Sequence, residues 1–151
     1  MLSKEKWGNA TWYLFHTMAF KVRNGSRELL DDKINLIKRI CEELPCPYCM
    51  IHAKNYLGRH NINNMKTGDE LFEYLNTFHN EVNVNLDKPR MSIEDSKELY
   101  SRANTRAVFE HYISITRLST GNPLQMMNTF ARNNTTQEFI RFLEKNFKNF
   151  N

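Results

Sequence analysis

The stretch WGNATWYLFHTMAF, residues 7–20, carries the clearest structural signal in the chain. Its mainly apolar side chains recur three or four positions apart, as on one face of a helix: Trp7, Ala10, Thr11, Leu14, Phe15 and Met18. Such a stripe predicts an amphipathic helix with one buried face. Asn24-Gly25-Ser26 follows as a turn signal and is expected to end the helix.

The same helical period continues outward from this stretch. It recurs over roughly 27–44, from the C-P-Y-C at 46–49 towards Gly58, over 67–88 and over 92–103. Capping-box patterns open the last two segments, at 67–70 and 92–95, and Pro89 ends the first of them. No convincing alternation of period two occurs, so the chain is predicted to be all-α, with a bundle-like core of four or five helices.

In the last third of the chain the helical pattern is interrupted. Val108, Tyr112, Ile115 and Leu118 indicate another helix, broken at 119–123, and TTQE at 135–138 resembles the cap of a final amphipathic segment. We therefore divide the chain into a domain at 1–104 and a C-terminal helical extension at 105–151. The extension could pack on the core, lie at a dimer interface or bind a partner, and the sequence leaves these options open.

The composition favours a single folded domain over a disordered, nucleic-acid-binding or membrane-spanning protein. A chain of 151 residues with 40% hydrophobic and 25% charged residues fits one folded domain. The net charge of +4 comes without a compact Lys/Arg run, so no nucleic-acid partner is expected. No signal-peptide pattern and no apolar stretch of about 18 residues is found, which predicts a soluble, cytoplasmic protein without a membrane span.

All three cysteines lie in CEELPCPYCMIH, residues 41–52. Zinc is one possibility, with Cys41, Cys46, Cys49 and His52 as ligands, but structural zinc sites usually join two separated pairs. A thioredoxin-like motif needs a preceding strand, and here a helix precedes. A redox pair at a helix start remains: residues i and i+3 lie about 5–6 Å apart, and the helix N-terminus is expected to lower a cysteine pKa.

Three motifs occur in a fixed order: W-G-x-x-x-W-x-x-x-H-T from Trp7, C-x-x-C from Cys46, and H-N-E-V-N-x-x-L-x-K-P from His79. Together they resemble the Erv/ALR family of FAD-linked sulfhydryl oxidases over about residues 7–102. The resemblance implies a four-helix bundle that holds FAD, with a short fifth helix, assembled as a homodimer. It also implies a thiol oxidase that makes protein disulfides and passes electrons from substrate dithiols through the cysteine pair and flavin to oxygen, giving hydrogen peroxide.

The resemblance also implies roles for particular residues. Cys46 accepts electrons from the substrate, Cys49 faces the flavin, and no metal ligand is implied. The implied FAD contacts are Gly8, Trp12, His16, Cys49, His79, Asn80, Val82, Asn83, Lys88 near the phosphates, and Tyr100, which stands where many members have tryptophan. Cys41 lies on an apolar stripe and is expected to be a core residue.

Some features depart from the family pattern. No second C-x-x-C is present, and Ile93 stands where a structural cysteine usually follows the K-P turn. This compact pattern resembles the viral branch of the family. The resemblance implies that the protein acts in the host cytoplasm, and association with the virion stays open. It also implies dithiol proteins as substrates, thioredoxin-like ones among them. The alternative is a non-enzymatic helical interaction module in which the C-P-Y-C forms a structural disulfide.

Overall fold

The computed structural model describes residues 3–116 and 123–150, with side chains for 3–116 and 134–150. Its helices are α1 (Lys4–Lys21), α2 (Arg27–Glu42), α3 (Pro47–Arg59), α4 (Gly68–Asn85), α5 (Ile93–Ser101), α6 (Thr105–Thr116) and α7 (Pro123–Asn146), with 3₁₀ turns η1 (Ile62–Asn64) and η2 (Phe147–Asn149). Within these ranges no strand forms apart from an isolated bridge between Val22 and Phe150. The predicted all-α fold is confirmed.

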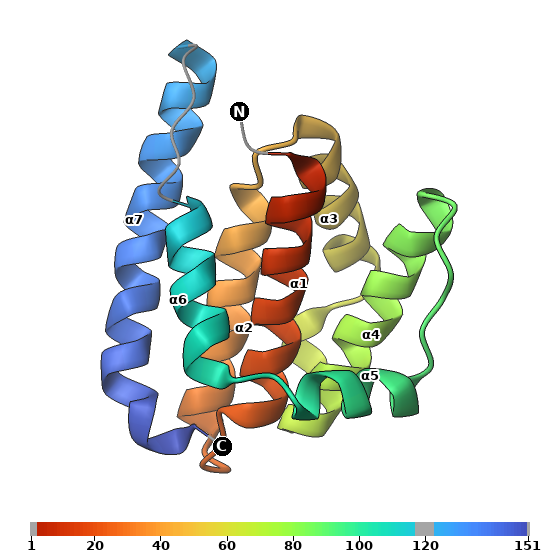
Figure 1. Cartoon of the computed structure of the whole chain (residues 1–151), viewed down its shortest axis with the longest axis vertical. Coiled ribbons are helices and arrows are strands. Elements are labelled where there is room, and N and C mark those ends of the chain that lie inside the picture. The colour runs from red at the N-terminus through yellow and green to blue at the C-terminus, as the bar shows by residue number, and fades with distance from the viewer. Residues whose placement is uncertain (1–2, 117–122, 151) are drawn as a thin grey trace.

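Helices α1 to α4 build the core that holds the site. The central helix α1 packs against α2 and α4, while α3 packs against α2 and α5 crosses the ends of α1 and α4 (Figure 1). The stripe predicted on α1 is buried through Ala10, Thr11, Leu14, Phe15 and Met18. Burial of these side chains, at about 25 cal/mol per Å² of apolar surface, is the main force that holds the helices together.

Short polar side chains set where the helices begin. The Thr67 hydroxyl accepts a hydrogen bond from the Glu70 N–H at 3.1 Å, and the Ser92 hydroxyl accepts one from the Asp95 N–H at 3.1 Å. Both predicted N-caps are therefore confirmed, and each satisfies a donor that the helix itself leaves unpaired. Before α2, the turn needs Gly25, whose φ of +71° is the left-handed conformation that glycine adopts at little cost.

The helix start predicted at 135–138 is wrong. Helix α7 runs through these positions, and both threonines are buried inside it. The Thr135 hydroxyl donates to the Glu43 carboxylate of the loop after α2, and the Thr136 hydroxyl donates to the Thr116 hydroxyl at 3.2 Å. Tertiary partners therefore use the hydroxyls that a capping box would have used locally. The break predicted at 119–123 falls mostly outside the described residues.

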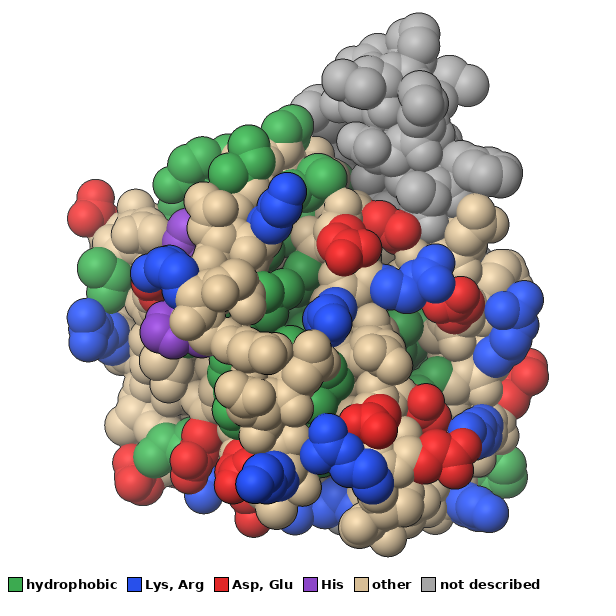
Figure 2. All heavy atoms as spheres, turned by 180° about the vertical axis from the view of Figure 1, so that it is seen from behind, with side chains coloured by type: hydrophobic (Ala, Val, Ile, Leu, Met, Phe, Trp, Pro, Cys, Tyr) green, Lys and Arg blue, Asp and Glu red, His purple; other side chains and the backbone are tan. Residues whose placement is uncertain are grey.

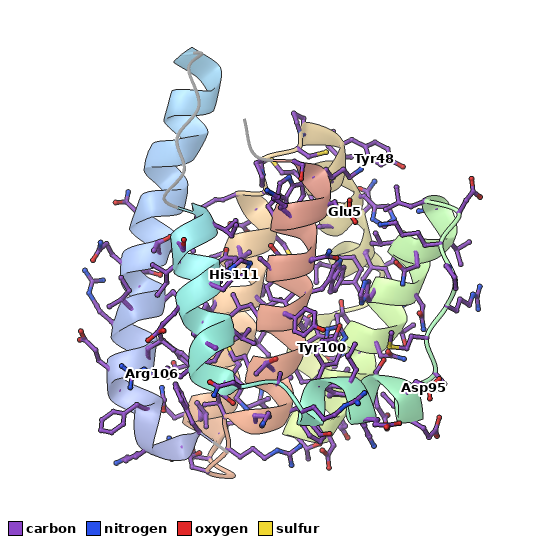
Figure 3. The ribbon with its side chains drawn as sticks, in the orientation of Figure 1. Glu5, Tyr48, Asp95, Tyr100, Arg106 and His111 are labelled. Atoms are coloured by element: carbon purple, nitrogen blue, oxygen red, sulfur yellow. The ribbon has the colours of Figure 1, made fainter. Side chains whose placement is uncertain are left out.

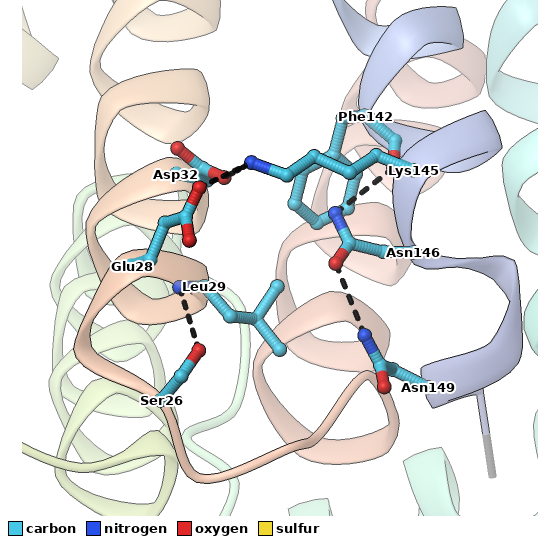
Figure 4. Close-up of polar contacts among 8 residues, drawn as sticks. All are labelled: Ser26, Glu28, Leu29, Asp32, Phe142, Lys145, Asn146 and Asn149. Carbon is cyan, nitrogen blue, oxygen red and sulfur yellow. Dashed lines mark hydrogen bonds and ion pairs between the residues drawn. The ribbon is translucent and has the colours of Figure 1, made fainter.

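The C-terminal extension packs on the core. Helix α6 lies along α1, and α7 lies along α2 and α6 (Figure 1). Phe109 and Phe139 are both buried, with ring centroids 5.4 Å apart in an edge-to-face contact. At the outer edge the Lys145 ammonium contacts the Glu28 carboxylate at 2.6 Å and the Asp32 carboxylate at 3.3 Å (Figure 4). Ion pairs between solvent-exposed side chains contribute little to stability because water screens them, so aromatic burial carries most of this interface.

None of the helices in the described part of the chain is both long enough and apolar enough to cross a membrane.

Candidate functional site

A cavity of about 540 Å³ lies between α1, α3 and α4, near the start of α3. This volume is within the usual range of about 300–1,000 Å³ for a small-molecule or cofactor site. Seven of the predicted site residues line it: Gly8, Trp12, Cys49, His79, Val82, Asn83 and Lys88. The three sequence motifs, far apart along the chain, therefore meet at one cavity.

An aromatic wall forms one side of this cavity. The Trp12 indole stacks on the His79 ring with centroids 4.2 Å apart and planes inclined by 10°. Phe78 meets Trp12 edge to face at 5.1 Å. The wall joins α1 to α4, and Gly8 lies one turn before Trp12 on the same face of α1. A Cβ added at Gly8 would meet no atom within 4 Å, so a side chain there would enter open space in the cavity.

His16 and Tyr100 lie behind the aromatic wall and do not line the cavity. Their rings stack with centroids 4.4 Å apart and planes inclined by 5°. Nδ1–H of His16 donates to the Trp12 carbonyl at 2.9 Å, whereas its Nε2 is buried without a hydrogen-bond partner. Figure 3 shows Tyr100 projecting from α5 towards α1. The pair therefore supports Trp12 from the interior of the bundle.

The segment after α4 places Lys88 at the cavity. Asp87 adopts φ +55°, and its N–H donates to the Val84 carbonyl at 3.1 Å. The Lys88 N–H donates to the Asn83 carbonyl at 2.7 Å, which completes a Schellman motif. This motif ends α4 at Asn85, four residues before Pro89, the expected stop. It also turns the chain so that Lys88 faces the cavity.

Asn80 does not line the cavity and instead holds this segment in place. Its Nδ2 donates to the Met91 carbonyl, and its Oδ1 accepts from the Met91 N–H, both at 2.8 Å. The Asn80 carboxamide therefore makes two hydrogen bonds to the Met91 backbone, and these bonds join α4 to the chain that leads to α5. Its predicted contact with a cofactor stays a prediction.

The C-P-Y-C begins α3 at the edge of the cavity. Cys46 is the N-cap residue, and its sulfur accepts a hydrogen bond from the Cys49 N–H at 3.2 Å. Pro47 occupies the first helical position, where a missing N–H has no cost. Both cysteines are half-buried. Negative charge on the Cys46 sulfur would therefore meet the partial positive charge of the helix N-terminus.

Cys49 lacks the low pKa that was expected at the helix start, and Cys41 is the buried core residue that was expected. Burial raises the pKa of Cys49 to about 11, helped by the hydrogen bond to Cys46 and the charge of Cys46, while Lys4 acts in the opposite direction. Burial, with a smaller effect of Glu42, raises the pKa of Cys41 to about 12. Cys41 is 3% exposed, as expected for a core residue. Desolvation is therefore the largest influence on the pKa of Cys49, and it raises this pKa where the helix start was expected to lower it.

Sequence reasoning did not assign several polar residues to the cavity, among them Lys4, Glu5 and His52, of which His52 was considered only as a zinc ligand. Helical spacing could have identified two of them, since Lys4 lies one turn before Gly8 and His52 lies one turn after Cys49. The His52 Nε2 lies 3.0 Å from the Asn85 Nδ2 and 3.2 Å from a Glu81 carboxylate oxygen. No group of three or more metal-binding side chains is arranged around a common point in the described residues.

Acid should destabilise the folded protein through two histidines, His79 in the aromatic wall and the buried His16 behind it. Burial, opposed by the bond to Trp12, lowers the pKa of His16 to about 3, and burial together with Lys88 lowers that of His79 to about 4. Below the ordinary value of 6.5, only the unfolded chain takes up these protons, so stability is present above pH 6.5 and falls towards pH 4. The two residues together should remove about 4 kcal/mol of unfolding free energy between pH 7 and pH 5.

Urea unfolding at several pH values measures this effect. The variant His79→Phe should lose about half of the pH dependence, since one of the two depressed groups is gone. The variant His111→Gln, at an exposed position on α6 (Figure 3), should keep all of it. An equal slope in the wild type and His79→Phe would contradict the assignment.

Comparison with known proteins agrees with this arrangement. The model of the Erv1/Alr family matches residues 9–102. A protein of Invertebrate iridescent virus 3, named as a candidate FAD-linked sulfhydryl oxidase, is 32% identical over 99 residues, which cover 62% of this chain and 65% of its own length. The chain thus spans just under two thirds of that relative. No solved structure gives a significant match.

Two further relatives carry the same functional name. An FAD-linked sulfhydryl oxidase of African swine fever virus is 32% identical over 100 residues, 64% of this chain and 82% of the relative. FAD-linked sulfhydryl oxidase ERV1 of Oryza sativa subsp. japonica is 35% identical over 91 residues, 58% of this chain and 45% of the relative. The family match covers more than half of the chain and contains the second and third motifs together with the first motif from residue 9 onward. The chain therefore belongs to the Erv1/Alr family.

Proposed function

We propose that this protein is an FAD-linked sulfhydryl oxidase, which converts pairs of protein thiols into disulfides. The observation that carries the proposal is the C-P-Y-C at the edge of a cavity whose aromatic wall is Trp12 stacked on His79. A redox-active cysteine pair needs a second electron carrier close by, and a cavity of this size provides room for one. The names of the viral and plant relatives support the same activity.

The residues at the cavity fit FAD. The Trp12 and His79 rings offer flat surfaces for a planar aromatic group, and Gly8 leaves space beside them. Lys88 supplies a positive charge on the same cavity, suited to the pyrophosphate. Asn83 adds a carboxamide that can both donate and accept hydrogen bonds. When bound, FAD would accept an electron pair from the cysteines and deliver it to oxygen, giving hydrogen peroxide.

The two cysteines have unequal roles in this proposal. A substrate thiolate attacks the sulfur of Cys46 in the oxidised pair, the bond between Cys46 and Cys49 breaks, and a mixed disulfide with Cys46 forms. The second substrate thiolate then attacks this mixed disulfide and releases the substrate as a disulfide. The electron pair now resides on the reduced cysteines. The position of Cys49 on the cavity wall suits it to pass these electrons inward.

The surface around Cys46 is suited to contact with protein. Tyr48 is 62% exposed and Ile51 is 60% exposed, and both lie on α3 beside the cysteine pair. Figure 2 shows hydrophobic side chains gathered at the end of the molecule where α3 begins. Exposed apolar patches of this kind often mark binding surfaces. We expect dithiol proteins, thioredoxin-like ones among them, to dock here.

Assembly and location remain parts of the proposal. A homodimer would have to form on a surface other than the faces of α1 and α2 that α6 and α7 cover. Two of the relatives are viral proteins, and the location that we propose is the cytoplasm of an infected cell.

Purified protein tests the proposal directly. We expect it to carry tightly bound flavin, visible as yellow absorbance and identified as FAD after release, and to consume oxygen when a dithiol is added, with one hydrogen peroxide formed per disulfide. Folded protein that neither carries nor takes up FAD would reject the oxidase and leave the non-enzymatic interaction module. Flavin binding without thiol oxidation would place the redox chemistry elsewhere.

A further inference from the structure

The first turn of α1 brings a positive charge to the cysteine pair. Lys4, the first residue of α1, lines the cavity together with Cys49 and Tyr48. Its ammonium nitrogen lies 5.9 Å from the centroid of the Tyr48 ring. Figure 3 shows the neighbouring Glu5 and Tyr48 at the same end of the molecule, one from α1 and one from α3. The helix that carries the aromatic wall therefore also contacts the turn that carries the cysteines.

The surroundings of Cys49 contain opposing influences. Burial, the hydrogen bond to Cys46 and the charge of Cys46 disfavour the Cys49 thiolate and raise its pKa, whereas the charge of Lys4 favours the thiolate. Other titratable residues also line the cavity: Glu5, Tyr48, His52, His79 and Lys88. Of the charged groups around the cavity, Cys46 and Lys4 influence the pKa of Cys49, and the Lys4 ammonium also lies 5.9 Å from the ring of Tyr48, the residue next to Cys49. Lys4 is therefore the cation that opposes desolvation at this sulfur.

The importance of Lys4 changes with the redox stage. When a substrate thiolate attacks Cys46, Cys49 leaves with both electrons of the broken bond and becomes a thiolate. Cys46 is then held in the mixed disulfide and carries no charge. Its unfavourable effect on Cys49 is removed at that moment, and the remaining influences are burial and Lys4. A leaving thiol departs faster when its thiolate is better stabilised.

We propose that Lys4 is the electrostatic partner of the Cys49 thiolate, which stabilises this sulfur as a leaving group while Cys46 is bound to the substrate. The inference rests on the proposed function, because it assigns Cys46 to the substrate and Cys49 to the inner position. It adds to that function a residue outside all three motifs. The first turn of α1 thereby controls the ease with which the cysteine pair accepts electrons.

Alkylation of Cys49 in the Cys46→Ser variant tests the inference without flavin or turnover. Cys46→Ser removes the charge of Cys46, as the mixed disulfide does, and leaves buried Cys41 protected. The rate of iodoacetamide addition, followed by mass spectrometry across pH, reports the Cys49 thiolate. Adding Lys4→Met should move the midpoint upward by about one pH unit, which is close to a tenfold slower reaction below the midpoint. Adding Lys4→Arg should restore most of the parental rate, because the charge returns.

Lys6→Met is the matched control. Lys6 is exposed on the same helix but does not line the cavity, so its loss should leave the midpoint unchanged. An unchanged midpoint in Lys4→Met, or an equal shift in Lys6→Met, would overturn the inference. The outcome is separate from that of the oxidase proposal, because protein that never binds FAD can still be alkylated and measured.

Discussion

The variant Cys49→Ser should lose dithiol-driven oxygen consumption by more than about 10³-fold while it keeps its flavin. A serine hydroxyl cannot form a disulfide with Cys46, so the electron pair from the substrate has no path inward. The substitution exchanges one sulfur atom for oxygen at a half-buried position, and the aromatic wall of Trp12 and His79 is untouched. Oxygen electrode traces and the flavin spectrum measure both parts of the prediction.

The third cysteine provides the matched control. Cys41 is buried in α2 with a pKa of about 12, so it carries essentially no thiolate at neutral pH. The variant Cys41→Ala should therefore keep most of the turnover. If Cys49→Ser still oxidised dithiols, or if Cys41→Ala were as inactive as Cys49→Ser is expected to be, the assignment of the redox pair would be wrong.

The second large effect concerns the C-terminal helices. Phe109 on α6 is 1% exposed and meets both Phe139 and Phe150 edge to face, with centroids 5.4 and 5.1 Å away. Truncation of a buried phenylalanine removes this contact and leaves a cavity, at a cost of about 3–5 kcal/mol. Since natural domains are stable by only about 5–15 kcal/mol, Phe109→Ala should remove a large fraction of the total.

Phe147→Ala is the control for the same chemical change. Phe147 is 70% exposed, so its truncation should alter the unfolding free energy by less than about 0.5 kcal/mol. Urea unfolding, followed by two spectroscopic probes, distinguishes the variants. If Phe109→Ala unfolded α6 and α7 separately from the core, the two probes would no longer coincide. A single transition at lower urea would indicate that 105–151 folds together with 1–104.

Local pattern was sufficient for most helices. The stripe on residues 7–20 repeats with helical period, and the same side chains are buried on α1. Thr67 and Ser92 cap the helices that follow them, because a hydroxyl three residues before an unpaired N–H can reach it in almost any fold. Such interactions need only neighbouring residues. They can therefore be predicted before the tertiary structure is known.

Prediction failed where distant partners decide. Thr135 has the same local pattern as Thr67, yet it lies inside α7 because Glu43 accepts its hydroxyl. Distant partners also set the position of Asn80, whose carboxamide is bonded to the Met91 backbone, while its predicted contact with a cofactor stays a prediction. A short polar side chain has several possible partners. Only the packed structure determines which one is within reach.

The sequence by itself determined the all-α fold, the three motifs and their resemblance to one family, because these depend on residue type and spacing along the chain. Tertiary structure alone decided which motif residues reach the cavity, with Gly8, Trp12, His79 and Lys88 on its wall and His16 with Tyr100 behind it. It also decided the state of Cys49, whose pKa rises because burial, together with the hydrogen bond to Cys46 and its charge, outweighs the opposing effect of Lys4. Desolvation depends on every atom around a group, and that information is absent from any local pattern.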